Sequence, residues 1–418
     1  MRRTLPSSAR ALRHHNYRLW AGADLVSVTG SWMQVLGLNW VVLERTGSAT
    51  AVGFSVLAGT LPALLVGPFA GALADRVDPR RIIMAGQAVH LGLALLLAVL
   101  VWGGAPLGML YLLTAVSGVV TSVEGPALGR FGAQVVPPED LPNALALGSL
   151  VNSAGRVLGM SLAGVLAAAV GEPALFLVNA VTFLAVISTV RAVRVGELHP
   201  LAVSAPERAG LRAGLAHVRA NSTLLTLFAL GFVLSSLGRN YQVTMAAMSS
   251  GPLDAGAEGY GLLSAVFAVG AVIGGLIAAR MRRLGAPVLL AAAATTSVLQ
   301  AVSGLMPGLF GFAALILAIA AGAVVIDTVM GTRVQLDSAE EMRGRVLSVQ
   351  GAVAAAAGAV GGPLLGWMCE GLGPGPALVV AGLVTLAVTG CAAVALGVDR
   401  RAAARVVEDR VPVAAAAG

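Results

Sequence analysis

Long apolar stretches alternate with short polar or glycine- and proline-rich breaks along nearly the whole chain. A helix that crosses a bilayer needs about 20 mainly apolar residues, and with that length the pattern predicts about twelve spans. They lie at 17–43, 50–75, 82–102, 108–131, 142–169 and 173–191, and at 222–248, 257–280, 286–306, 309–332, 343–369 and 376–397. The apolar runs show no period-two alternation, which favours helices over a membrane β-barrel.

Clusters of Gly and Pro, such as Gly103–Pro106 and Gly373–Pro376, separate the predicted spans, as turns require. The arginines before Leu19 are typical of a signal peptide. The apolar run to Leu43 is too long for one, however, and no small-residue cleavage site follows. We therefore expect an uncleaved first span.

The longest internal polar segment divides the spans into two sets of six. We expect an N-terminal six-helix bundle at 1–191, a cytoplasmic linker at 192–221, a C-terminal six-helix bundle at 222–398 and a disordered cytoplasmic tail at 399–418. Within the linker, residues 211–220 could form a short amphipathic helix on the membrane surface. Two sets of six spans are the layout of a duplicated transporter.

Composition supports a chain surrounded by lipid. Of 418 residues, 57% are hydrophobic and 11% are charged, against about 25% charged in soluble domains. In lipid the backbone must satisfy its own hydrogen bonds, so the prediction is an all-α membrane protein.

Charge predicts the orientation, because short arginine-rich loops stay in the cytoplasm. All 27 basic residues are arginines. Alternate connections carry them, whereas the opposite connections hold Arg45 and otherwise only acids. Both termini are therefore expected inside. The arginines form no basic face, which argues against nucleic-acid binding.

Other chemistries find little support. Cys369 and Cys391 lie within apolar segments without metal-ligand spacing, so we expect no metal and no cofactor. The chain has no nucleotide-binding GxxxxGK[ST] loop, which leaves an ion gradient or the substrate's own gradient as the energy source. His90 is the one histidine at membrane depth, and a lone histidine there is more often a packing residue.

The turn between the second and third spans reads Gly71-Ala72-Leu73-Ala74-Asp75-Arg76-Val77-Asp78-Pro79-Arg80-Arg81. It resembles the cytoplasmic signature of the major facilitator superfamily, with Asp78 and Pro79 departing from the pattern. The resemblance implies a gating role for Gly71, Leu73, Asp75, Arg76, Arg80 and Arg81. The matching segment of the second half, Gly275 to Arg283, looks like a decayed copy in which Ala279 replaces the aspartate.

Further segments resemble the siderophore- and macrolide-exporter-like branch of this superfamily. They include Asn16–Trp20, Gly30–Gln34, Leu43–Ser48, Glu139–Ala144 and Arg343–Val346. The resemblance implies two pseudo-symmetric six-helix bundles, transport by alternating access and a bacterial inner-membrane location. Gly155–Gly164 partly resembles a glycine-rich antiporter motif, but Met160 stands in place of its proline and helix packing explains the glycines equally well.

Five charged residues lie deep in predicted spans, where charges are costly and usually face a wet interior. They are Asp24, Glu124, Arg156, Arg239 and Asp327, on spans one, four, five, seven and ten. The resemblance implies that helices one, four, seven and ten line the central cavity. Polar residues at helical spacing extend two of these faces and predict a cavity lined by Ser27, Ser31, Gln34, Thr114, Ser117 and Thr121.

Each charge also has a plainer interpretation. Asp24 and Asp327 lie about two turns from the helix ends and could be hydrated without a role. Glu124 could serve packing or substrate selectivity, and Arg239 could have no role in transport. Arg156 is either a structural partner of Glu124 or Asp24 or a functional residue. We expect Glu124, assisted by Asp24, to carry the coupling proton.

The predicted function is a secondary active transporter, not an enzyme, that exports a small organic compound in exchange for protons. Uptake by the same fold is the alternative, and a polytopic membrane enzyme is a much weaker one because it would need clustered His, Asp or Glu near the interface. The expected partners are the lipid bilayer, a small organic substrate and the proton, for a chain expected to be monomeric. The acids suit a cationic substrate and the arginines an anionic one, and the sequence leaves this open.

Overall fold

The computed structural model describes residues 7–199, 210–281, 285–339 and 342–408. In this part of the chain twelve segments are long and apolar enough to cross a membrane, which confirms the predicted spans. The first half has six helices: α1 (His15–Thr46), α2 (Ala49–Arg76), α3 (Pro79–Trp102), α4 (Leu107–Gln134), α5 (Leu141–Val170) and α6 (Pro173–Ala192).

The second half contains α8 (Ser222–Gly238), α9 (Tyr241–Ser250), α10 (Gly256–Arg280), α11 (Ala286–Ser303), α12 (Leu309–Leu336), α13 (Arg343–Leu372) and α14 (Pro374–Glu408). Short helices η1 (Ser7–Arg13), η2 (Pro138–Asp140), η3 (Val195–Glu197) and α7 (Gly210–Ala220) lie outside the spans. No strand occurs among these elements.

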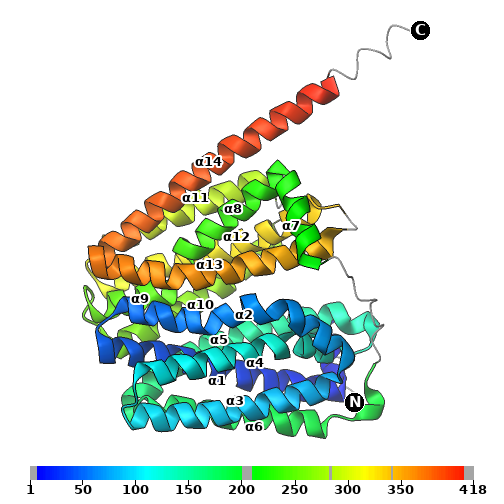
Figure 1. Cartoon of the computed structure of the whole chain (residues 1–418), viewed down its shortest axis with the longest axis vertical. Helices are drawn as coiled ribbons and strands as arrows, with labels where there is room; N and C mark the ends of the chain where they lie inside the picture. Colours follow the sequence, from blue (N-terminus) through cyan, green and yellow to red (C-terminus); the bar gives the residue numbers. More distant parts are fainter. Residues whose placement is uncertain (1–6, 200–209, 282–284, 340–341, 409–418) are drawn as a thin grey trace.

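The two halves repeat one arrangement. In the first half α2 packs on α4, α3 on α6, and α1 on both α5 and α6. In the second, α10 packs on α12, α11 on α14, and α8 on both α13 and α14. The halves meet through α2 against α13 and α5 against α10, with the first half below the second in Figure 1. This is the two-bundle arrangement that the sequence predicts.

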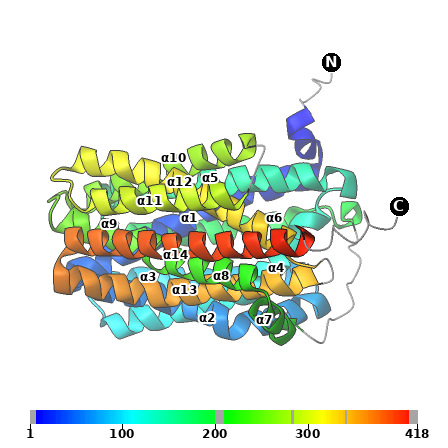
Figure 2. The same ribbon diagram turned by 90° about the horizontal axis from the view of Figure 1, so that it is seen from above.

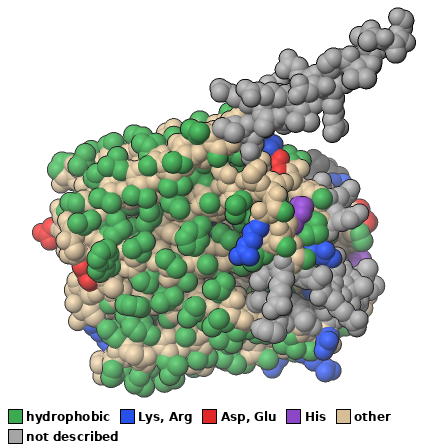
Figure 3. Space-filling view, turned by 45° about the horizontal axis from the view of Figure 1, so that its top comes forward, with side chains coloured by type: hydrophobic (Ala, Val, Ile, Leu, Met, Phe, Trp, Pro, Cys, Tyr) green, Lys and Arg blue, Asp and Glu red, His purple; other side chains and the backbone are tan. Residues whose placement is uncertain are grey.

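Successive spans are antiparallel, so the connections alternate between two ends of the molecule. The end that holds the start of α1 and the ends of α2, α4 and α6 carries Arg76, Arg80, Arg81, Arg130, Arg191 and Arg194, and we call it the arginine-rich end. Arginine side chains gather toward one end of the largely apolar surface in Figure 3. At the opposite end, Arg45 donates to the carbonyls of Val101 and Ala105 at the end of α3, where the helix dipole favours a cation.

Close contact between the halves is concentrated at the opposite end. A Cβ added to Gly53 of α2 would lie 2.3 Å from the carbonyl oxygen of Gly362 in α13, and one added to Gly358 would lie 3.7 Å from Thr60. Nearer the arginine-rich end, a Cβ on Gly67 or Gly351 would meet nothing within 4 Å. The halves therefore touch at the opposite end and separate toward the arginine-rich end.

Polar contacts reinforce this closed end. The Glu370 carboxylate of α13 accepts hydrogen bonds from the Ser48 hydroxyl and from the Thr50 amide and hydroxyl at the start of α2. An anion at a helix N-terminus is favourable. Asn39 donates to Gln242 across the halves. Figure 2 shows the spans side by side, with the start of α1 and the end of α14 at one end of the molecule.

The seventh span differs from the prediction. The sequence predicts one helix over 222–248, but the structure breaks it between α8 and α9 at Arg239 and Asn240. The Asn240 amide donates to the Ser236 carbonyl at 3.0 Å, and the Gln300 amide donates to the Leu237 carbonyl at 2.7 Å. Side chains thus replace the lost backbone donors, which makes a break tolerable at membrane depth.

Two further segments refine the predicted organisation. A helix forms over Gly210–Ala220 as the sequence suggests, and it packs on α13 and α8, with Val218 only 2% exposed. The tail predicted to be disordered from residue 399 continues α14 as far as Glu408. Residues 401–405 are mostly alanine and arginine, which are strong helix formers, while 409–418 lie outside the described residues.

Candidate functional site

A polar cavity of about 360 Å³ lies inside the first half. Helices α1, α3, α4, α5 and α6 all contribute to its wall. Seven residues selected from the sequence line it: Asp24, Ser27, Ser31, Gln34, Ser117, Thr121 and Glu124. The two predicted polar stripes therefore meet on one surface, because α1 and α4 face each other across the cavity.

Glu124 lies at the centre of a buried hydrogen-bonded network. Its side chain accepts from the Gln87 amide at 2.9 Å, and its Oε2 lies 3.5 Å from His90 Nε2. His90 also contacts the Ser117 hydroxyl at 3.2 Å and the Thr121 hydroxyl at 3.5 Å. Glu124 is only 2% exposed and His90 8%, so both side chains are buried where they meet.

Two neighbours fix this pair in place. The His90 ring stacks on Phe183, with ring centroids 5.3 Å apart. Gly86 leaves room for the carboxyl group, because a Cβ there would lie 2.8 Å from Glu124 Cδ. The positions of both titratable side chains are therefore set by packing from α3 and α6.

Asp24 lies at the junction of two cavities. It lines the polar cavity and also a neighbouring one of about 320 Å³, which reaches Tyr17, Ala144 and Gly148 near the arginine-rich end. Trp20 and Asn152 line both cavities as well. No hydrogen bond or ion pair joins Asp24 to another described side chain, and the residue lies on the walls of both cavities.

Thr114 is not part of this surface. Its hydroxyl donates to the Leu110 carbonyl, and its methyl group lies 3.5 Å from where a Cβ of Gly59 would be, in the α2–α4 contact. Gln34 remains on the cavity wall and accepts from the Asn179 amide at 2.8 Å. Helical spacing alone placed Thr114 on the polar face, and the packing of α2 on α4 covers it.

The second half has a cavity of about 240 Å³ with a mostly apolar wall from α8, α12 and α13. Its charged residues are Arg239 and Asp327, which form an ion pair. Their side chains are 44% and 40% exposed, so this pair faces open space within the protein.

Arg156 does not contact Glu124. Its guanidinium carbon lies 5.8 Å from the ring centroid of Trp32, a geometry for a cation–π interaction. It interacts electrostatically with Arg239 and Asp327 of the second half. The structure thus places Arg156 at the gap between the halves, away from the partner that the sequence suggested.

The motif between α2 and α3 has a clear local structure. Asp78 begins α3 by accepting from the Arg80 amide at 2.9 Å, with Pro79 in the first helical turn. The Arg80 guanidinium donates to the Val190 carbonyl at the end of α6. Leu73, Arg76 and Arg81 are exposed, whereas Gly71 and Asp75 are in α2 with side chains outside those described.

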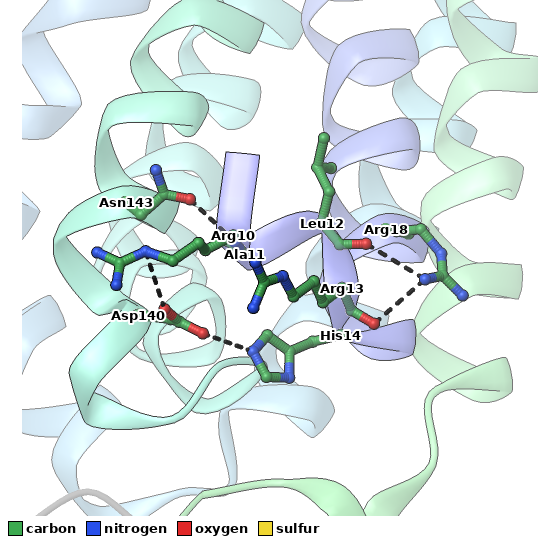
Figure 4. A network of polar contacts seen from close by, with 8 residues as sticks. All are labelled: Arg10, Ala11, Leu12, Arg13, His14, Arg18, Asp140 and Asn143. Atoms are coloured by element: carbon green, nitrogen blue, oxygen red, sulfur yellow. Dashed lines mark hydrogen bonds and ion pairs between the residues drawn. The ribbon is translucent and has the colours of Figure 1, made fainter. Parts of the chain in front are cut away.

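Other motif residues fasten the start of the chain to the first half. Asp140 pairs with His14 at 2.8 Å and with Arg10 at 3.8 Å, and Asn143 accepts from the Ala11 amide (Figure 4). Asn16 exchanges two hydrogen bonds with the Arg194 backbone, and the Tyr17 hydroxyl donates to the Ala144 carbonyl. The shared motifs at 16–20 and 139–144 therefore hold α1, α5 and the end of α6 together.

Sequence reasoning undervalued His90 and Gln87 and missed the break at Arg239. His90, Gln87 and Gly86 lie at spacings of three or four, which places them on one face of α3, but only the fold brings that face to Glu124. The Gly238-Arg239-Asn240 tripeptide was the local signal for the break.

Two repeated six-helix halves, each with an internal cavity and joined by two helix pairs, define a membrane transporter of the major facilitator type. Residues 7–412 match the family described as Transmembrane secretion effector, and the chain belongs to this family. It is a multi-pass membrane protein, and the family consists of transporters rather than enzymes.

Similar proteins agree with this assignment. The chain is 22% identical to macrolide efflux protein A of Streptococcus pyogenes, over 82% of this chain and 87% of that protein. It is 23% identical to the staphyloferrin A transporter of Staphylococcus aureus, over 59% of this chain and 63% of that protein's length. A bacterial homologue of the iron transporter ferroportin, in its inward-facing state, shares the fold with a TM-score of 0.69 at 18% identity, covering 91% of this chain and 98% of that one.

Proposed function

We propose that this chain exports a small organic compound in exchange for protons, with the arginine-rich end in the cytoplasm. The observation that carries the coupling is the buried Glu124 carboxyl group beside His90, on the wall of a polar cavity. Similarity to an efflux protein favours export. In this orientation the structure is open toward the cytoplasm and closed outside.

The Glu124–His90 pair can act as a proton carrier. Its deprotonated state must be stabilised by water. With one proton shared between them, the pair has no net charge. Losing that proton leaves one negative charge in a buried site, and such a charge is costly without hydration. The cavity that contains Asp24 near the arginine-rich end supplies a wet route for the released proton.

Coupling then requires only that the two conformations bind proton and substrate differently. Closing the arginine-rich end would exclude water from the Glu124–His90 pair and favour its protonated state. Opening that end would hydrate the pair and favour release of the proton into the cytoplasm. We assign Asp24 an assisting role, because it lines both the polar cavity and the neighbouring cavity nearer the arginine-rich end. Asp75 and Arg76 are proposed to gate this end without contacting substrate.

The test is transport in proteoliposomes under an imposed pH gradient, with ethidium as a cationic probe and pyrenebutyrate as an anionic one. Glu124→Gln should abolish pH-driven movement of whichever probe is transported, while exchange down the probe's own gradient survives. Asp24→Asn should show a milder loss. Glu172→Gln, at the opposite end, is the matched control and should behave as wild type.

A Glu124→Gln variant that transports at the wild-type rate with unchanged pH dependence would refute the coupling role. Comparing inverted with right-side-out vesicles separates export from uptake, since uptake would reverse the direction of pH-driven movement. For the orientation, cysteines replacing Ser204 and Ala415 should resist an impermeant thiol reagent in intact cells. Labelling of both without lysis would reverse the proposed topology.

A further inference from the structure

Arg156 is held at the gap between the halves by the packing of α5 on α1. Gly155 and Gly159 lie directly against α1, since a Cβ on Gly159 would be 2.3 Å from the Thr29 carbonyl oxygen. Arg156 lies on a neighbouring face of α5, which it shares at helical spacing with Asn152 and Met160. Asn152 lines the polar cavity and Met160 is buried. Its guanidinium lies over Trp32, and its Nε is buried without a hydrogen-bond partner. A buried donor of this kind is costly unless something accepts from it.

Arg239 and Asp327 of the second half lie within electrostatic range of Arg156. They pair with each other, and both interact electrostatically with Arg156 across the gap. Two guanidinium groups and one carboxylate leave one net positive charge. The cluster is therefore short of one anion.

The break in the seventh span adds to this positive field. The last carbonyls of α8 accept from the side-chain amides of Asn240 and Gln300. At the start of α9, the side chain of the N-cap residue Asn240 makes no capping hydrogen bond. The negative end of α8 is thus largely neutralised, while the positive end of α9 is not.

An apolar surface lies next to the charges. Leu227, Phe228, Ile326 and Met330 line the cavity of about 240 Å³ that holds Arg239 and Asp327. A ligand with a charged end at the gap could place an apolar body against this wall. Pockets that combine an apolar wall with a few convergent polar groups are typical of small-molecule sites.

We propose that this site binds an amphipathic organic anion, whose carboxylate bridges Arg156 of the first half and Arg239 of the second. Guanidinium groups match carboxylates in geometry and charge. The apolar part of the anion lies against the wall formed by α8 and α12. The inference rests on the proposed transport function and names its substrate class.

Exchange of an anion for a proton has a consequence for charge movement. One monoanion leaving and one proton entering carry two positive charges inward, whereas exchange of a monocation for a proton carries none. Transport should therefore accelerate when the membrane potential is negative on the cytoplasmic side.

Equilibrium binding tests the site without any gradient. The full chain in lipid nanodiscs is titrated with 1-pyrenebutyrate, its methyl ester and the matching trimethylammonium compound, by energy transfer from tryptophan, with empty nanodiscs subtracted. The wild type should bind the acid at least about tenfold more tightly than the ester, which corresponds to about 1.4 kcal/mol. Arg156→Gln should remove this preference while ester binding persists.

Arg239→Gln combined with Asp327→Asn removes the ion pair without leaving an unpaired charge, and it should also weaken the preference. Arg219→Gln, on the exposed side of α7, should not change it. Retained ester binding shows that each variant is folded. Glu124→Gln should keep the preference for the acid, so a failure of proton coupling can be told apart from a failure of this site.

Several results would overturn the proposal. They are equal binding of acid and ester by the wild type, tighter binding of the ammonium compound, and an unchanged preference in Arg156→Gln. Absence of saturable binding by every probe would count against it in the same way.

Discussion

The two halves share one arrangement of helices but differ in what their cavities contain. The first-half cavity is polar, with Asp24, Glu124 and His90 among hydroxyl and amide groups. The second-half cavity has a mostly apolar wall and a single ion pair, Arg239 with Asp327. A duplicated fold has thus come to hold two different chemistries.

The two cavities differ in the residue that contacts their buried or partly buried acid, Glu124 in the first half and Asp327 in the second. Glu124 is buried against His90, whose Nε2 lies 3.5 Å from the carboxyl group. Asp327 is half exposed and paired with an arginine, which stays charged. We therefore infer that the first half carries the proton and the second half contributes to substrate binding, and the following predictions test that division.

The largest expected difference in pH-driven transport is between the Glu124→Gln and Asp327→Asn variants. Asp327→Asn should keep pH-driven transport, because the proton pair lies in the other half. It should also raise the affinity for pyrenebutyrate by about tenfold, or about 1.4 kcal/mol, because Arg239 loses its internal carboxylate. The binding and proteoliposome assays given above measure both effects. Loss of pH-driven transport in Asp327→Asn would show that the second half carries the coupling proton. The proposed division of roles between the halves would then be wrong.

A smaller effect is expected at the arginine-rich end, where the first half has Asp75 and the second half has Ala279 in the matching segment. Asp75→Asn should lower turnover about fivefold, close to 1 kcal/mol in the barrier, with probe affinity unchanged. Ala279→Ser is the matched control and should leave turnover near wild type. The measurements are initial transport rates and nanodisc affinity. Lost binding with an intact fold would show that Asp75 acts on the substrate site instead.

The smallest effect concerns the contact between α2 and α13. Gly53→Ala would place a Cβ against the Gly362 backbone, whereas Gly67→Ala, on the same helix, meets nothing within 4 Å. Gly53→Ala should hinder closure of the opposite end and shift the ratio of the two conformers about threefold, or about 0.65 kcal/mol. Spin-label distances across that end measure the ratio. Equal ratios in both variants would show that close packing at Gly53 does not control closure.

Much of the fold could be predicted because its determinants are local. Apolar stretches of spanning length, Gly and Pro breaks and alternating arginines are properties of neighbouring residues, and they gave the twelve spans and the two halves. The polar stripes on α1 and α4 follow from helical spacing, so Asp24, Ser27, Ser31 and Glu124 could be selected without a structure. The departure of Thr114 shows the limit, because spacing gives a helix face but not what covers it.

The tertiary structure alone decided which charges meet. Glu124 pairs with His90 because α3 packs on α4, and Arg156 faces Arg239 and Asp327 because α5 lies at the boundary between the halves. It also decided that the seventh span breaks at Arg239, where amides from Asn240 and Gln300 replace lost backbone donors. These contacts join residues far apart in the chain, and their energies depend on distances that the packing of whole helices sets. The sequence by itself therefore determined the spans and their polar faces, and helix packing determined the pairing of the charges.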